Sequence, residues 1–143
     1  MEQDRREEMR LEMDSLSENE EFARVVVAVF LSRLNPTLEE IDDVKTAVSE
    51  AVTNAVIHGY GGGVGKIRIL AAAEDREFTV EISDRGAGIA DVKKAMEPMF
   101  TTDPSGERSG MGFSFMEAFM DQVEVISAPG QGTKVIMKKR IGA

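Results

Sequence analysis

The sequence contains no cysteine, which excludes disulfide bonds, thiolate metal sites and catalysis by a thiol. Together with that absence, a single histidine leaves no conventional zinc site. No apolar run approaches the roughly 20 residues that a membrane-spanning helix needs. The charged start, residues 1–8, lacks the apolar segment of an export signal. We therefore expect a cytoplasmic protein that does not associate with membranes.

Positive charge is also scarce, because 17 lysines and arginines face 26 acidic residues and give a net charge of −9. Such a surface would repel the phosphates of nucleic acid, so direct binding to nucleic acid is not expected. The charge suits a basic protein partner, although many proteins are acidic for solubility alone. With 143 residues, the chain is long enough for one domain with one core. We expect that domain to span residues 9–143 behind a charged leader at 1–8.

Hydrophobic periodicity predicts the element order β-α-α-β-β-α-α-β-β. Residues 9–13 alternate as a half-buried strand, and the capping-box pairs Ser17/Glu20 and Thr37/Glu40 begin helices that reach about residues 34 and 58. Further along, the pattern predicts a strand hairpin (66–73 and 78–83), a short helix (91–97), a loop (100–109), a helix (113–120) and a second hairpin (122–128 and 133–139). This order predicts an α/β (α+β) two-layer sandwich, a mostly antiparallel mixed sheet with helices on one face.

Three polar side chains stand out on the predicted helix that ends near residue 58. Glu50, Asn54 and His58 recur every four residues and therefore share one face. A carboxylate beside the core is costly unless it is solvated, paired or close to a metal. Taken singly, a solvated helix flank explains these residues equally well, and a histidine is favoured at a helix C-terminus. They border the apolar stripe made by Val44, Val48, Ala51, Val52 and Ala55.

Two glycine strings complete the pattern. Asp84-Arg-Gly86-Ala-Gly88 follows a strand-like run, and its glycines let the backbone pass close to a flat ligand. Gly110-Met-Gly112 opens a helical run, where free amides favour anions. Alone, an aspartate before glycine is common turn chemistry. The coincidence of all three strings predicts a nucleotide site with a mobile lid.

Two other nucleotide-binding motifs resemble parts of the sequence but do not match it at a required position. After the glycine loop at 61–66, Ile67 stands where a P-loop requires serine or threonine. After Gly86 and Gly88, Asp91 stands where a dinucleotide fingerprint needs its third glycine. Neither of these phosphate loops is therefore expected.

The three strings resemble the N box, G1 box and second glycine box of the ATP-binding fold shared by gyrase-type topoisomerases, Hsp90, histidine kinases and MutL. Thr133 after Gly132 resembles the late threonine that supports the base-binding aspartate of that fold. Strings at 20–24, 48–60, 100–102 and 107–113 are similar to the sporulation anti-sigma F factors, a family of serine kinases that also hold a sigma factor inactive. The resemblance runs from about Met9 to the end of the chain.

This resemblance implies ATP or ADP and Mg²⁺ as cofactors. Asp84 would accept the exocyclic amine of adenine, with Thr133 in support, while Asn54 would be the Mg²⁺ ligand. Glu50 would be the catalytic base that orients a partner's serine hydroxyl. The other implied nucleotide contacts are His58, Gly86, Gly88, Thr101, Thr102, Arg108, Ser109, Gly110, Met111 and Gly112.

The implied partners are a sigma factor of the F type, an anti-anti-sigma antagonist that is the phosphorylation substrate, and a second copy of the chain. Arg24 and Glu20 are implied at the partner surface. Three other interpretations stay open: a sensor histidine kinase module, a pure binding module that ATP only shapes, and the anti-sigma kinase of the general stress response. The first would need an upstream helix pair with a phospho-accepting histidine, and only eight residues, six of them charged, precede the first predicted strand.

Overall fold

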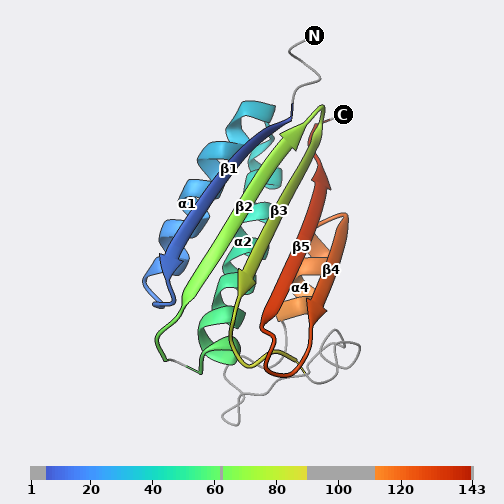
Figure 1. Ribbon diagram of the computed structural model, residues 1–143. Helices are drawn as coiled ribbons and strands as arrows, with labels where there is room; N and C mark the ends of the chain where they lie inside the picture. Colours follow the sequence, from blue (N-terminus) through green and yellow to red (C-terminus); the bar gives the residue numbers. More distant parts are fainter. Residues whose placement is uncertain (1–5, 62, 90–111, 143) are drawn as a thin grey trace.

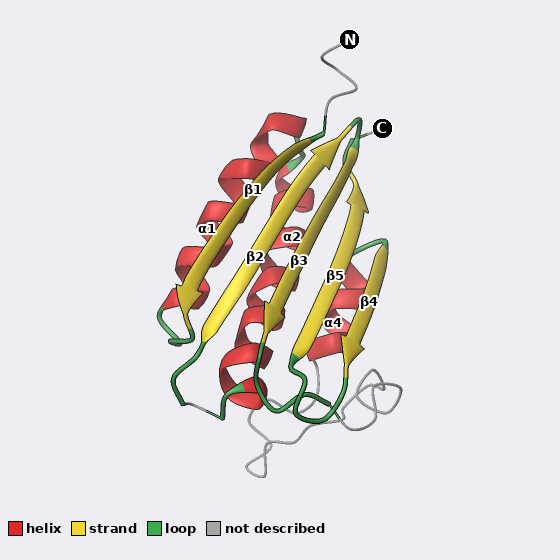
Figure 2. Ribbon diagram, viewed as in Figure 1, coloured by secondary structure: helices red, strands yellow, loops and turns green. Residues whose placement is uncertain are grey.

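The fold is built on one antiparallel sheet, against which the helices pack (Figure 1). The computed structural model describes residues 6–61, 63–89 and 112–142. Within these ranges the strand order is β1-β2-β3-β5-β4, and every neighbouring pair is antiparallel. The helices cover one face of the sheet and leave the other face open (Figure 2). The strands are β1 (Glu7–Asp14), β2 (Lys66–Glu74), β3 (Glu77–Asp84), β4 (Gln122–Ser127) and β5 (Thr133–Arg140); the helices are α1 (Asn19–Leu31), α2 (Leu38–Asn54) and α4 (Gly112–Phe119).

The predicted two-layer architecture is confirmed, and the strands form where side chains alternate between core and surface. In β3, Phe78, Val80 and Ile82 are buried while the residues between them are half-exposed. The β2–β3 hairpin closes through a two-residue turn in which Asp75 adopts a left-handed φ of 55°. The predicted helix at 91–97 and loop at 100–109 lie outside the described residues.

One of the two predicted capping boxes is confirmed. At the start of α2, the Glu40 amide donates to Thr37 Oγ1 (3.1 Å) and the Thr37 amide donates to Glu40 Oε1 (2.9 Å). The prediction for Ser17 and Glu20 is wrong, because α1 has Glu18 as its N-cap residue and no side-chain cap. The Glu20 carboxylate instead accepts hydrogen bonds from hydroxyls on α2. Glu20 therefore makes a tertiary contact with α2 in place of the local capping contact that its spacing from Ser17 predicted.

The end of the long helix also differs from the prediction. Residues 38–54 are α-helical, but Ala55–Gly59 form a π turn, closed by a hydrogen bond from the Tyr60 amide to the Ala55 carbonyl (3.0 Å). His58 therefore lies on this wider turn and not on the continuous α-helix that was expected. Such π turns are frequent at functional sites.

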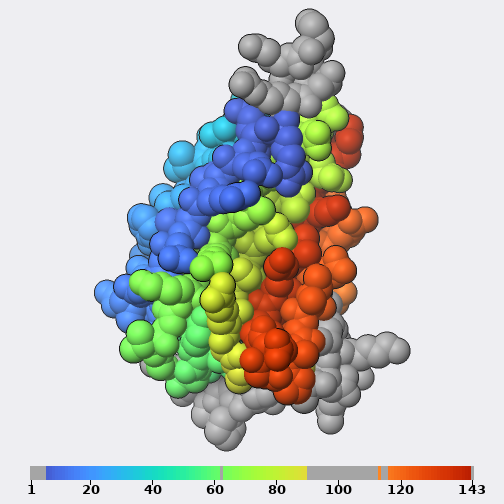
Figure 3. Space-filling model, in the orientation of Figure 1, coloured from blue at the N-terminus to red at the C-terminus, as the bar shows by residue number. Residues whose placement is uncertain are grey.

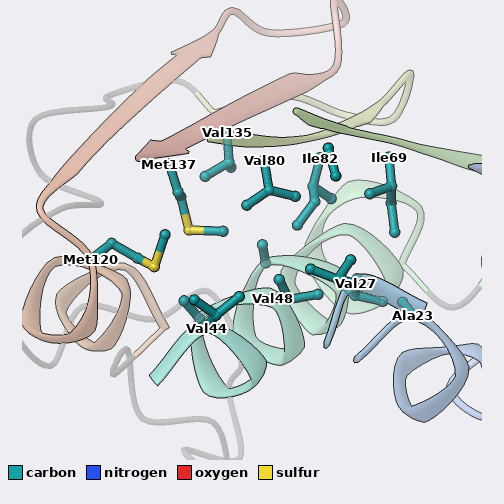
Figure 4. Packing of buried hydrophobic residues seen from close by; sticks show 14 of the residues in the cluster. Ala23, Val27, Val44, Val48, Ile69, Val80, Ile82, Met120, Val135 and Met137 are labelled. Atoms are coloured by element: carbon teal, nitrogen blue, oxygen red, sulfur yellow. The ribbon is translucent and has the colours of Figure 1, made fainter. Parts of the chain in front are cut away.

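The hydrophobic core lies between the helices and the covered face of the sheet (Figure 4). In the figure, Val44 and Val48 of α2 point toward Val80 of β3 and Met137 of β5. Every residue of the apolar stripe predicted on α2 is buried. Burial of this kind supplies the main force that holds helices to sheet.

The first and last described residues, Arg6 and Gly142, lie toward one end of the sheet. The register pairs Glu7 with Ala73 and Glu77 with Arg140 there, whereas Asp84 pairs with Thr133 at the opposite end. The Arg76 guanidinium donates to the carbonyls of Leu34 (2.6 Å) and Ile141 (2.8 Å), and the Gly142 amide donates to Glu40 Oε2 (2.9 Å). These contacts, which we call the distal clasp, join α2, the turn after α1 and the chain end.

The open face of the sheet carries charged side chains in cross-strand pairs (Figure 3 views this face). Arg68 Nε lies 2.7 Å from Glu12 Oε1, and Lys66 Nζ lies 2.5 Å from Asp14 Oδ1. None of the helices in the described ranges has the length and apolar character that crossing a bilayer demands.

Candidate nucleotide site

The predicted base-binding residues come together where β3 and β5 pair. Asp84 is the last residue of β3 and lies directly opposite Thr133, the first residue of β5. Both side chains are buried, at 8% and 5% exposure. The antiparallel register thus brings together two residues that are 49 positions apart, as the resemblance implied.

Asp84 has little solvent around its carboxylate. Burial raises its pKa, and hydrogen bonds from the backbone amides of Gly86 and Thr133 oppose that rise. The Gly86 amide lies 2.8 Å from Asp84 Oδ1. A side chain at Gly59 would place its Cβ 2.9 Å from the same oxygen, so only glycine leaves this space. The site therefore holds a buried hydrogen-bond acceptor beside the end of the N-box helix.

The π turn packs its backbone directly against the G1 segment, residues 84–88. The Ala87 amide donates to the Gly59 carbonyl (2.7 Å), and a Cβ at Gly86 would lie 2.0 Å from that carbonyl oxygen. Gly88 has a φ of 76°, and a Cβ there would lie 1.9 Å from the Ala128 carbonyl oxygen. The sequence suggested that these glycines make room for a ligand. The structure gives them an internal reason as well, since two backbone segments approach through them.

Ser127 is a site residue that the sequence reasoning missed. Its hydroxyl accepts from the Ile89 amide (2.8 Å), donates to the Gly132 carbonyl (2.8 Å) and lies 2.9 Å from Thr133 Oγ1. Because its one proton goes to Gly132, Thr133 is the donor of the last bond. The observed register places residue 127 opposite 133, and the predicted hairpin of 122–128 and 133–139 was the available signal.

Tyr60 was also missed, although it lies only two residues after the end of the N box at His58. Its hydroxyl donates to the Lys66 carbonyl (2.7 Å) and accepts from the Arg85 amide (2.8 Å). The ring packs against Gly65, where a Cβ would lie 2.4 Å from it. Tyr60 thereby joins the glycine loop, β2 and the start of the G1 segment.

Glu50, Asn54 and His58 are half-buried, which agrees with their predicted place at the edge of the core. Glu50 and Asn54 are four residues apart on α2 and share a face. Their contacts with a nucleotide stay a prediction. Of the predicted lid residues, Gly112 begins α4 as expected, whereas Thr101, Thr102, Arg108, Ser109, Gly110 and Met111 lie outside the described residues.

The two predicted partner residues differ in their surroundings. Glu20 is half-buried, and its carboxylate accepts from Ser49 Oγ (2.5 Å) and Thr53 Oγ1 (3.2 Å). Arg24, one turn further along α1, has a buried Nε without a hydrogen-bond partner among the described residues. Its Nη2 lies 3.6 Å from Oε1 of the exposed Glu21. A buried donor without an acceptor is uncommon in folded proteins.

Hydrophobic side chains on the outer side of α1 were not predicted to be exposed. Phe22, Val25 and Val29 are 51%, 51% and 66% exposed and recur at three- and four-residue spacing. We call these three residues the α1 stripe. Apolar surface gathered in this way is typical of interaction sites.

A cavity of about 600 Å³ lies on the open face of the sheet, behind Asp84 and Thr133. Lys66, Arg68 and Lys134 line it. Asp84 and Thr133 also contribute to its lining, while the Asp84 carboxylate lies against Gly59 on the helix side. In the part of the chain that the structure describes, no group of three or more histidine or acidic side chains converges as a protein-only metal site would.

Comparisons with known proteins agree with this arrangement. Residues 14–139 match the family described as the histidine kinase-like ATPase domain. An anti-sigma F factor of Clostridium acetobutylicum is 61% identical over 132 residues, 92% of each chain, and one of Pasteuria penetrans is 54% identical over 97% of this chain and 94% of its own.

Two solved structures share the fold. The RsbU and RsbW domains of a Mycobacterium tuberculosis protein superpose with a TM-score of 0.69 at 22% identity, over 94% of this chain and 32% of that one. The catalytic domain of the histidine kinase ThkA gives a TM-score of 0.58 at 19% identity, over 93% and 96% of the two chains. With the buried aspartate, the paired threonine and the N-box helix in place, the chain belongs to the anti-sigma F factors of the histidine kinase-like ATPase family.

Proposed function

We propose that this protein sequesters a sporulation sigma factor of the F type and is also an ATP-dependent serine kinase. An anti-anti-sigma antagonist would displace the sigma factor and be phosphorylated on a serine. One observation carries the proposal: Asp84, Thr133 and the N-box helix meet in a chain 61% identical to an anti-sigma F factor. The relatives' names support sigma binding, and the family supports the use of ATP.

The chemistry of Asp84 supports adenine as the base. An ionised carboxylate only accepts hydrogen bonds, so it would receive the exocyclic amine of adenine and repel the carbonyl of guanine. Thr133 donates its proton to Ser127 and keeps acceptor capacity toward the base or a water. ATP and ADP share this base, so the residues would hold both.

Asn54 would hold Mg²⁺ through its carboxamide oxygen, because the ion prefers oxygen ligands and shares its shell with nucleotide phosphates. ATP supplies the phosphoryl group. Glu50, one turn earlier, would orient the serine hydroxyl and take its proton. Phosphoryl transfer demands mainly positioning and charge neutralisation, so a carboxylate of ordinary basicity suffices. Arg108 and the other lid residues would complete the phosphate contacts.

Helix α1 fits the partner surface. The Arg24 side chain is 34% exposed and its Nη2 faces the exposed Glu21, so this end of the guanidinium would pair with a partner carboxylate. The α1 stripe beside it offers apolar area that a partner would bury. Since β1 is an edge strand on the same side of the molecule, a homodimer would also form there. With these partners, the protein would act in the cytoplasm.

The test is a pull-down with sigma factor and antagonist in ATP and in ADP, followed by incubation with γ-labelled ATP. We expect sigma to be captured with ATP, and label to appear on an antagonist serine. Label on a histidine of this chain would instead support a histidine kinase. Sigma capture without any labelled partner would identify a binding module, and capture of a stress-response sigma would identify the sibling kinase.

A further inference from the structure

Glu20 connects the partner-facing helix to the N-box helix. Its two carboxylate oxygens accept from Ser49 Oγ (2.5 Å) and Thr53 Oγ1 (3.2 Å), 29 and 33 residues further along the chain. Ser49 and Thr53 are one turn apart on α2, and Thr53 is buried. The contact is thus a clamp of one carboxylate across two successive turns of a neighbouring helix.

The clamp holds the turns that carry the proposed chemistry. Ser49 immediately precedes Glu50, and Thr53 immediately precedes Asn54. Residues that follow one another on a helix are separated by a fixed rotation, so holding Ser49 and Thr53 fixes the direction of Glu50 and Asn54. A shift of α1 against α2 would therefore turn both of them relative to the nucleotide.

Glu20 makes this contact instead of two interactions that were available within its own helix. Glu20 does not cap its own helix with Ser17, although such a cap usually stabilises a helix start. It also forms no ion pair with any described residue, while Arg24, one turn away, turns toward the exposed Glu21. The Glu20 carboxylate thus binds hydroxyls at the junction of α1 and α2. Arg24 does not pair with it and would be available to a partner.

We propose that Glu20 is a positioning residue that couples partner binding on α1 to the geometry of Glu50 and Asn54. This inference rests on the proposed function. It assigns Glu20 a role that operates through Ser49 and Thr53, beneath the surface that a partner touches. Linkage then requires that nucleotide and partner influence each other's affinity through this contact by the same factor.

The test uses Ser49→Ala/Thr53→Val, which removes both donors and leaves the outer surface of α1 unchanged. We expect the ratio of sigma affinities in ATP and ADP to fall by about fivefold or more. The kcat for the antagonist serine should fall while its KM stays constant. Glu20→Gln should match these effects, and adding it to the double variant should change little, because all three residues act as one unit. Glu39→Gln, an exposed acid at the start of α2, is the charge control.

Two results would overturn the inference. One is a Ser49→Ala/Thr53→Val protein with unchanged coupling and kcat. The other is a Glu20→Gln substitution that weakens sigma binding equally with and without the two hydroxyls, which would mean direct contact with the partner. Melting curves identify any variant that fails to fold, in which case Ser49→Ala alone replaces the double variant. A failure of the proposed function itself would be seen separately, as wild-type protein without sigma binding or kinase activity.

Discussion

Among single residues, Asp84 combines burial with a negative charge at the end of β3. Its neighbours are backbone amides and the bare Cα of Gly59, so a ligand amine would find a fixed acceptor. Asp84→Asn replaces half of that acceptor with a donor. We expect ATP affinity to fall by about 1–3 kcal/mol, the range for one perturbed buried hydrogen bond, as measured by calorimetry. Unchanged affinity would remove Asp84 from the adenine contact.

The same burial predicts a pH dependence of folding. The pKa of Asp84 is raised in the folded protein above the value of about 4 in an unfolded chain. The folded state therefore binds this proton more tightly, and the stability that Asp84 contributes is lost as pH rises from about 4 through its folded pKa. Relative to wild type, Asp84→Asn should gain stability over that interval and then level off. Urea unfolding of both proteins from pH 4 to 7 measures this; a constant difference would contradict it.

We expect the replacement of Glu50 to affect phosphoryl transfer and to leave ATP binding unchanged. Glu50 lies half-buried on α2 at the edge of the core. Glu50→Ala should bind ATP normally and lose transfer of the γ-phosphoryl group to the antagonist, because no group orients the serine hydroxyl. A phosphorylation assay at saturating ATP tests it, with ATP affinity as the control. A normal rate would mean that Glu50 has no such role.

At the scale of elements, the candidate nucleotide site depends on backbone segments that touch through glycines. Gly88 combines a φ of 76° with a Cβ position 1.9 Å from the Ala128 carbonyl, whereas Gly130 has a φ of 75° and open space around it. Gly130→Ala should therefore cost only the backbone strain, about 1 kcal/mol. Gly88→Ala should cost about 1–3 kcal/mol more, because the β4–β5 turn has to move. Thermal unfolding compares them, and equal losses would mean that the contact adds nothing.

The elements that the sequence predicted are those with a clear period. Alternation located β1 and the two hairpins, and the Thr37 and Glu40 pair located the start of α2. What the sequence could not reveal depends on tertiary neighbours. Glu20 leaves its local cap because hydroxyls from α2 reach it, and the π turn at Ala55–Gly59 appears where that backbone packs against the G1 segment.

In the candidate site, too, sequence motifs predicted some residues, while others depend on tertiary contacts. Motif spacing predicted Asp84, the family resemblance implied Thr133, and the sheet register brings the two together. Ser127 was overlooked because a serine near a strand end has many ordinary explanations, and only its three partners distinguish it. The exposure of Val29 depends on which face α1 turns to the sheet, and periodicity alone left that face undecided.

For the whole molecule, the α1 stripe predicts where partners bind. Val29 is 66% exposed, so Val29→Ser should change unfolding free energy by less than about 0.5 kcal/mol. Sigma affinity should fall by about fivefold or more, as for a residue in an interface centre. Leu38→Ser, at an 81% exposed position on α2, is the matched control. Titration of labelled sigma factor measures both, and equal affinities for the two variants would place the interface elsewhere.

The distal clasp gives the molecule two unlike ends. Arg76 and Glu40 hold the chain end to the helix layer there, about 25 Å along the strands from Asp84. A fluorophore or surface anchor attached beside Arg140 would consequently sit on a fixed frame. Distance changes recorded from such an anchor to a label near Ala128 would report movement of the nucleotide end alone.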